Sequence, residues 1–214
     1  MIAAFRYCWW WDEARLQQQR DFIECLRRSG IKAVAFQFHD DPGPDIEGVE
    51  VLRVLRRRRV EGYAANPIVP EIFDRASELD NRFCFLCSDL LLRKDWAEPL
   101  LSLDSAGIGR RDITDIGFED WWNGKARFQV TGNGGGGYVG FSFDSKWWQA
   151  HRHLFPDYIN ASPIDTDYDA ICARHCPGYR RLRLADHRPH AKAWHHGDAD
   201  HLYNVAMGRP ASLC

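Results

Sequence analysis

Residues 82–92, which read RFCFLCSDLLL, carry the strongest strand signal in the chain. A short run rich in Phe and Leu predicts a strand that is buried on both faces, as in a parallel sheet. Cys84 and Cys87 lie within this run at CxxC spacing. Because side chains i and i+3 of a strand point to opposite faces, the spacing favours buried thiols over a zinc or redox pair.

Strand and helix patterns alternate on the amino-terminal side of this run. The expected strands are residues 1–10, 31–38 and 48–55, and the expected helices are residues 12–29 and 66–79. The second helix is predicted from Asn66-Pro67, with Asn at the cap and Pro at the first helical position. Such alternation indicates an α/β fold with a mostly parallel central sheet and helices on both faces.

The carboxyl-terminal side is less regular in sequence. Residues 104–140 contain many glycines and predict an irregular, moving loop that ends in a short strand at 138–143. Further elements are expected as a helix at 145–154 capped by Ser145, a helix at 167–176 and a strand at 179–185.

The composition is that of an ordinary globular domain. The chain has 214 residues, of which 45% are hydrophobic and 27% charged, and this length suits one sizeable core. The formal net charge of −2 argues against a general nucleic-acid-binding protein, although residues 56–59 form a run of four arginines. The sequence does not predict the oligomeric state.

No segment is apolar for long enough to predict a transmembrane helix, and the first residues do not resemble a signal peptide. The seven cysteines are an odd number at irregular spacing, which favours reduced thiols over a disulfide framework. These features lead us to expect a cytoplasmic protein.

Two groups of carboxylates are candidates for chemistry. Asp89 follows the apolar run, at the carboxyl end of a predicted strand, where α/β sheets bind their ligands. It can hold a divalent cation on a diphosphate, or serve as a turn or capping residue. Asp165, Asp167 and Asp169 precede or begin a predicted helix; one suffices as a cap, which leaves another for general-base catalysis.

Histidines, glycines and tryptophans supply weaker signals. The tail holds His187, His190, His195 and His196 at no standard zinc spacing, so we expect either surface residues or a single metal ligand. The run 134–137 of four glycines indicates a flexible loop or a close approach to a ligand. The pairs Trp121-Trp122 and Trp147-Trp148 indicate core residues, one of which could stack on a sugar or a nucleobase.

Taken in order, these motifs resemble the GT-A glycosyltransferases, in a family-2-like layout. In that family a helix led by an arginine-asparagine-like element precedes an apolar strand that ends in a DxD-type motif. Asn66 matches the helix start, and residues 85–89 (FLCSD) match the strand end. Residues 136–141 (GGYVGF) look like the family's glycine-rich acceptor segment, and residues 166–169 (TDYD) look like the helix start that carries its base.

The resemblance implies transfer of a sugar from a nucleoside-diphosphate sugar to a hydroxyl acceptor, with inversion and with Mn²⁺ or Mg²⁺. It implies a single domain, residues 1–214, with a nucleotide-binding half (1–103) and an acceptor-side half (104–214). The implied roles are Asp167 as catalytic base; Asn66, Ser88, Asp89, Gly136 and Gly137 as donor-binding residues; and Asp89, His187 and His190 as metal ligands.

Two positions depart from the family pattern. Cys87 stands where the first carboxylate of the DxD motif is expected, and Thr166 replaces the glutamate before the base. These departures keep open a catalytically degenerate binding protein on the same fold. A nucleotidyltransferase is the other alternative, although the place after its first strand would usually be glycine-rich and basic, and here it holds three tryptophans at residues 9–11.

Overall fold

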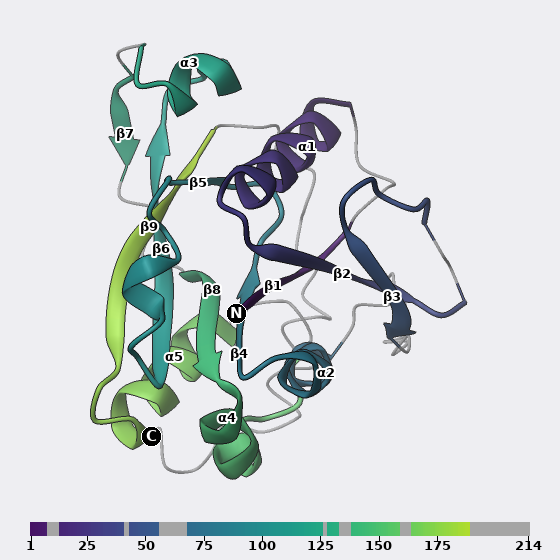
Figure 1. Cartoon of the computed structure of the whole chain (residues 1–214). Helices are drawn as coiled ribbons and strands as arrows, with labels where there is room; N and C mark the ends of the chain where they lie inside the picture. Colours follow the sequence, from purple (N-terminus) through teal and green to yellow (C-terminus); the bar gives the residue numbers. More distant parts are fainter. Residues whose placement is uncertain are drawn as a thin grey trace, which may run out of the picture.

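The structure is a computed structural model, and it describes residues 1–7, 13–40, 43–55, 68–125, 128–132, 138–158 and 164–188. Within these residues the chain forms one nine-stranded sheet (Figure 1). Its strands are β1 (Ile2–Arg6), β2 (Lys32–Phe38), β3 (Glu50–Leu55), β4 (Arg82–Leu86), β5 (Leu91–Leu92), β6 (Ser105–Ile113), β7 (Val130–Gly132), β8 (Tyr138–Asp144) and β9 (Arg180–His187).

The strand order is β3-β2-β1-β4-β8-β6-β9-β5, and β7 pairs with β6 outside this path. The strands β1, β2, β3, β4, β6 and β9 run in one direction, and β5, β7 and β8 run in the other. The prediction of a mostly parallel central sheet is therefore confirmed. Because β4 pairs with β8, a single sheet runs through both halves of the chain.

Helices cover both faces of the sheet, as predicted. On one face α1 (Glu13–Arg28) places Phe22 and Leu26 against Phe5 of β1. On the other face lie α2 (Val69–Leu79), α4 (Ser145–His151) and α5 (Ile164–His175), which contribute Phe73, Trp148 and Tyr168 to a second cluster, rich in aromatic side chains. The alternation of strand side chains feeds both clusters, because neighbouring residues of a strand face opposite sides.

The predicted strand at 82–92 is two strands. β4 ends at Leu86, the turn around Ser88 and Asp89 follows, and Leu91 and Leu92 alone form β5, paired with the end of β9. Polar residues at 88 and 89 explain the break, since a carboxylate is costly within a buried strand. The break puts Asp89 beyond the carboxyl end of β4, as the sequence suggested.

The prediction of an irregular loop over 104–140 is wrong for its first part. Residues Ser105–Ile113 form β6, which lies between β8 and β9 in the interior of the sheet. Its apolar residues Ala106 and Ile108 alternate and pack on the α1 face. The short helix α3 (Phe118–Trp122) and β7 follow. Gly136 and Gly137 lie outside the described residues.

Several helix boundaries and one cap differ from the prediction. Helix α2 begins at Val69, with Ile68 at the N-cap position and Pro70 in the first turn, and Asn66 lies outside the described residues. Helix α4 is capped by Asp144, whose Oδ1 accepts a hydrogen bond of 3.0 Å from the Trp147 backbone N–H, so Ser145 is not the cap.

Helix α5 begins at residue 164, three residues before the predicted start. After α4 the chain continues as a 3-10 turn, η3 (Arg152–Leu154), and another such turn, η1 (Glu98–Leu100), follows β5. Among the helices of the described residues, none is both long enough and apolar enough to cross a lipid bilayer.

Candidate functional site

Polar side chains gather where the parallel strands of the sheet end. Asp89 follows β4, Asp112 lies near the end of β6, and His187 is the last residue of β9. These strands run in the same direction, so their carboxyl ends lie along one edge of the sheet. Open α/β sheets bind their ligands at this edge.

Asp89 and His187 lie close together although they are far apart in the sequence. The Oδ2 atom of Asp89 is 3.9 Å from Nε2 of His187, and both side chains are largely buried. A carboxylate and an imidazole at this separation are two of the ligand types that divalent metals use. The fold thus brings together two of the three metal ligands that the sequence suggested; the third, His190, lies outside the described residues.

Asp112 is the second carboxylate beside His187, and the sequence analysis missed it. Its Oδ1 atom is 3.2 Å from Nδ1 of His187 and 3.2 Å from Nε of Arg110. Asp112 lies in the segment that was predicted to be irregular. The alternation of Ala106 and Ile108 was the signal that could have revealed the strand and its polar end.

A buried arginine also reaches this edge. Arg15 of α1 is 4% exposed, and its Nη2 atom lies 3.9 Å from Oδ2 of Asp89. Ser88 stands between the same helix and β1, because its hydroxyl oxygen is 2.8 Å from Oε1 of Gln19 and 3.0 Å from the backbone oxygen of Arg6. These contacts fix the turn that carries Asp89.

Asp167, the predicted base, comes from the first turn of α5. Its carboxylate is buried, and Oδ2 accepts a hydrogen bond of 2.9 Å from the hydroxyl of Tyr158. Its neighbour Asp169 binds Arg181 near the start of β9, through Oδ1 at 2.9 Å from Nε, whereas His187 ends the same strand. Arg181 lies about 20 Å along β9 from His187. The role of Asp167 as a base stays a prediction.

The tryptophan pair of α3 is held by charged side chains rather than by the core alone. Nε1 of Trp121 donates a hydrogen bond of 3.0 Å to Oδ2 of Asp186. The guanidinium of Arg28 lies 5.4 Å from the ring centre of Trp122, and the amine of Lys94 lies at the same distance from that ring. These contacts give both rings structural partners.

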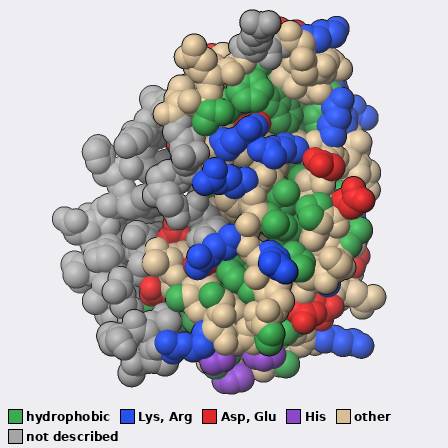
Figure 2. Space-filling model, turned by 90° about the vertical axis from the view of Figure 1, so that its left-hand side faces the viewer, with side chains coloured by type: hydrophobic (Ala, Val, Ile, Leu, Met, Phe, Trp, Pro, Cys, Tyr) green, Lys and Arg blue, Asp and Glu red, His purple; other side chains and the backbone are tan. Residues whose placement is uncertain are grey.

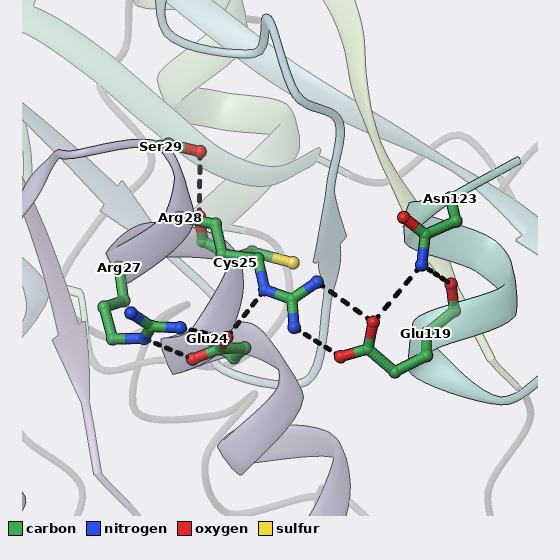
Figure 3. A network of polar contacts seen from close by, with 7 residues as sticks. All are labelled: Glu24, Cys25, Arg27, Arg28, Ser29, Glu119 and Asn123. Atoms are coloured by element: carbon green, nitrogen blue, oxygen red, sulfur yellow. Dashed lines mark hydrogen bonds and ion pairs between the residues drawn. The ribbon is translucent and has the colours of Figure 1, made fainter.

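Arg28 also ties the end of α1 to α3 through carboxylates (Figure 3). It binds Glu119 of α3, with Nη1 at 3.2 Å from Oε2, and Glu24 of its own helix, with Nε at 2.6 Å from Oε1. Hydrogen bonds from Arg27 and then Arg28 lower the pKa of Glu24 to about 2. The network holds α3 against the end of α1. Because Trp121 of α3 donates a hydrogen bond to Asp186, α3 in turn contacts the end of β9.

Within the described residues, no three or more His, Cys, Asp or Glu side chains form a group arranged to hold a metal ion. Mg²⁺ is often held by one or two carboxylates together with substrate phosphates, and Asp89 supplies one such carboxylate. Cys84 is buried, which raises the pKa of its thiol well above the usual range, as expected for a core cysteine. An open hollow lined by Ser77, Asp80 and Ser145 lies before β4, at the opposite edge of the sheet.

Basic side chains are prominent on one side of the molecule. Figure 2 shows the face on the left of Figure 1, where Lys and Arg side chains gather among apolar ones. On β9, Arg180, Arg181 and Arg183 are exposed. The stem of Arg183 lies beside Gly109 of β6. The chain thus has a basic surface despite its net negative charge.

The sequence matches no protein-family model and no curated protein. Among solved structures, the chain is similar to the glycosyltransferase GlyE of Streptococcus pneumoniae TIGR4, at 12% identity and a TM-score of 0.43, covering 99% of this chain and 61% of that chain. The apo form of GlyE matches at 15% identity and a TM-score of 0.38, over 85% of this chain and 45% of that one.

A hypothetical transferase from Thermus thermophilus matches at 11% identity and a TM-score of 0.40, over 86% of this chain and 92% of that chain. The chain therefore spans about three fifths of the first GlyE structure. Because these sequence identities and TM-scores are low, the fold and the candidate site are described from the geometry of this chain alone.

Proposed function

We propose that this protein is a glycosyltransferase that transfers a sugar from a nucleoside-diphosphate sugar to an acceptor hydroxyl. The observation that carries the proposal is the meeting of Asp89 and His187, at 3.9 Å, where the parallel strands β4 and β9 end. The order of motifs along the chain supports it, because Asp89 and His187 are the residues that match metal ligands in the GT-A resemblance.

Asp89 and His187 would hold Mn²⁺ or Mg²⁺ on the donor diphosphate, with His190 as a further candidate. When bound, the cation would neutralise the charge that develops on the leaving diphosphate. Arg15 lies 3.9 Å from Asp89 and adds a fixed positive charge on the same side of the site. Ser88 holds the turn in place, and Asn66, Gly136 and Gly137 are proposed to contact the donor.

Asp167 is the proposed base, which would remove the proton from the acceptor hydroxyl and give inversion at the anomeric carbon. Its carboxylate accepts a hydrogen bond from Tyr158. Asp167→Asn is expected to abolish transfer and to leave donor affinity unchanged. A Tyr158→Phe variant is the matched control, because it removes the hydroxyl and keeps the carboxylate.

A degenerate binding protein on the same fold is the second candidate. Cys87 stands in place of the first carboxylate, and Arg15 already lies beside the remaining one. Such a protein would bind a nucleotide-sugar and would not turn it over. A nucleotidyltransferase, the other alternative, would instead release diphosphate from a nucleoside triphosphate.

The experiment is calorimetric titration with UDP and GDP, each with and without Mn²⁺, on the wild type, Asp89→Ala and Asp115→Ala. Asp115 is exposed and serves as the matched control. We expect binding of one nucleotide that depends on Mn²⁺, that falls by at least about tenfold in Asp89→Ala, and that is unchanged in Asp115→Ala.

Metal-dependent binding would justify a screen of sugar donors with product detection by mass spectrometry. Turnover of a donor would favour the transferase over the degenerate protein. If neither nucleotide binds under any of these conditions, the proposal is wrong, whatever the fold resembles.

A further inference from the structure

His187 has a carboxylate on each side of its ring. Nδ1 lies 3.2 Å from Oδ1 of Asp112, and Nε2 lies 3.9 Å from Oδ2 of Asp89. An ionised carboxylate only accepts hydrogen bonds, so Nδ1 is the nitrogen that carries a proton in the contact with Asp112. In a neutral ring, Nε2 then carries the lone pair, and this is the ring nitrogen that lies 3.9 Å from Asp89.

Asp112 is held firmly in this position. It is directly opposite His187 in the register of β6 and β9, and it also pairs with Gly132 of β7. Nε of Arg110, two residues earlier, is 3.2 Å from the same Oδ1 atom. A carboxylate on an interior strand, oriented by the guanidinium of a neighbouring arginine, is suited to fix the orientation of the His187 imidazole.

We infer that Asp112 is a positioning residue, which holds His187 in the tautomer that has its proton on Nδ1 and presents Nε2 to the cation beside Asp89. The inference rests on the proposed function for the cation and adds a residue that no motif in the sequence indicated. Histidines that bind metals commonly donate their other N–H to a carboxylate, which fixes the tautomer and raises the basicity of the ligating nitrogen.

The first test measures the tautomer itself, in protein without metal. Long-range proton–nitrogen correlation spectra assign the protonated ring nitrogen, and comparison with His187→Gln identifies the signals of His187. We expect Nδ1 to be protonated and Nε2 unprotonated in the wild type, and the Nε2-protonated form to become populated in Asp112→Ala. Protonation of Nε2 alone in the wild type, or spectra unchanged in Asp112→Ala, would overturn the inference.

Two further variants separate positioning from loss of structure. Asp112→Asn keeps an oxygen that can accept from Nδ1 and is expected to retain the wild-type tautomer. Arg110→Ala removes the side chain that orients Asp112 and is expected to shift the tautomer less than Asp112→Ala does. If Asp112→Asn shifts the tautomer as far as Asp112→Ala does, disturbance of the strand end explains the effect, and the inference is wrong.

The second test is Mn²⁺ titration in the presence of saturating UDP. Asp112→Ala is expected to weaken Mn²⁺ binding by about ten- to a hundredfold, and Asp112→Asn by less. An affinity within about twofold of wild type in Asp112→Ala would overturn the inference. Absence of Mn²⁺ binding in the wild type would contradict the proposed function instead, and the tautomer would still decide whether Asp112 positions His187.

Discussion

Arg111 of β6 and Asp186 of β9 form a two-pronged ion pair, with Nε 2.7 Å from Oδ1 and Nη2 2.9 Å from Oδ2. The carboxylate is almost fully buried and also accepts the hydrogen bond of Trp121. Hydrogen bonding to Asp186 raises the pKa of the Arg111 guanidinium. Because His187 is the next residue, this pair fixes the strand end that carries it.

Replacing Asp186 with Ala should therefore destabilise the fold. It leaves Arg111 and the indole N–H of Trp121 without their acceptor, and breaking a buried ion pair in this way costs about 3 kcal/mol. Urea unfolding followed by circular dichroism measures the change. Arg180→Ala, at an exposed position of the same strand, should change the free energy of unfolding by less than about 0.5 kcal/mol. Equal effects of the two substitutions would contradict this account.

Gly140 is required where β8 passes β4. A Cβ atom built there would lie 2.3 Å from the backbone oxygen of Phe85 and 2.9 Å from a methyl carbon of Leu86. Gly140→Ala is expected to lower the free energy of unfolding by about 3 kcal/mol, because the contact is with backbone that cannot move aside. Gly178→Ala, with open space around it, is the control and should be close to neutral. Thermal unfolding of the two variants compares them, and a neutral Gly140→Ala would show that β8 can shift.

The reactivity of the cysteine thiols should fall as their burial increases. Burial raises the pKa of Cys25 to about 12 and also raises those of Cys84 and Cys172. At pH 9 these thiols should react with iodoacetamide more than about tenfold more slowly than Cys87, which is only partly buried. Peptide mass spectrometry gives the rates, and the same protein in urea supplies the unprotected reference. Rapid labelling of Cys25 in the folded protein would be inconsistent with the packing of α1.

The network at the end of α1 should make stability depend on pH. The folded-state pKa of Glu24, about 2, is below its usual value of 4.5. The contribution of Glu24 to the free energy of unfolding is therefore fully present above pH 4.5 and is lost as the pH falls toward 2. The urea midpoint of the wild type should exceed that of Glu24→Gln at pH 6, and the two should converge toward pH 2. A difference that stays constant over this range would mean that Glu24 does not gain its stability from ionisation.

The strands of the amino-terminal half could be predicted because their sequences are rich in apolar residues and alternate with helical patterns. The sequence of β6 contains two glycines and two arginines, and this composition suggests a loop. Its place in the sheet is explained by contacts with β8 and β9, which are distant in sequence. The cap of α4 was misassigned by one residue because Asp144 and Ser145 are both favourable capping residues, and only the geometry separates them.

The candidate site could be predicted only in part for a related reason. Asp89 and His187 were selected singly, from their places after apolar strands and from the family resemblance. Their proximity follows from the pairing of β5 with β9, in which Leu91 lies opposite Asp186, and no local pattern encodes that pairing. Asp112 was missed with the strand that carries it. The roles of Asn66, Gly136, Gly137 and His190 stay predictions.

The strand order also affects how the protein folds during its synthesis. Strand β6 emerges from the ribosome well before β8 and β9, yet it pairs with both of them. Pairing between such distant segments is a slow step in folding, because a long loop must close first. A nascent chain that has reached residue 170 can complete the sheet from β3 to β6, but it has no strand to place beside Arg111 and no imidazole to meet Asp89. The part of the carboxyl edge that carries Asp89, Asp112 and His187 can therefore be completed only after β9 has been synthesised.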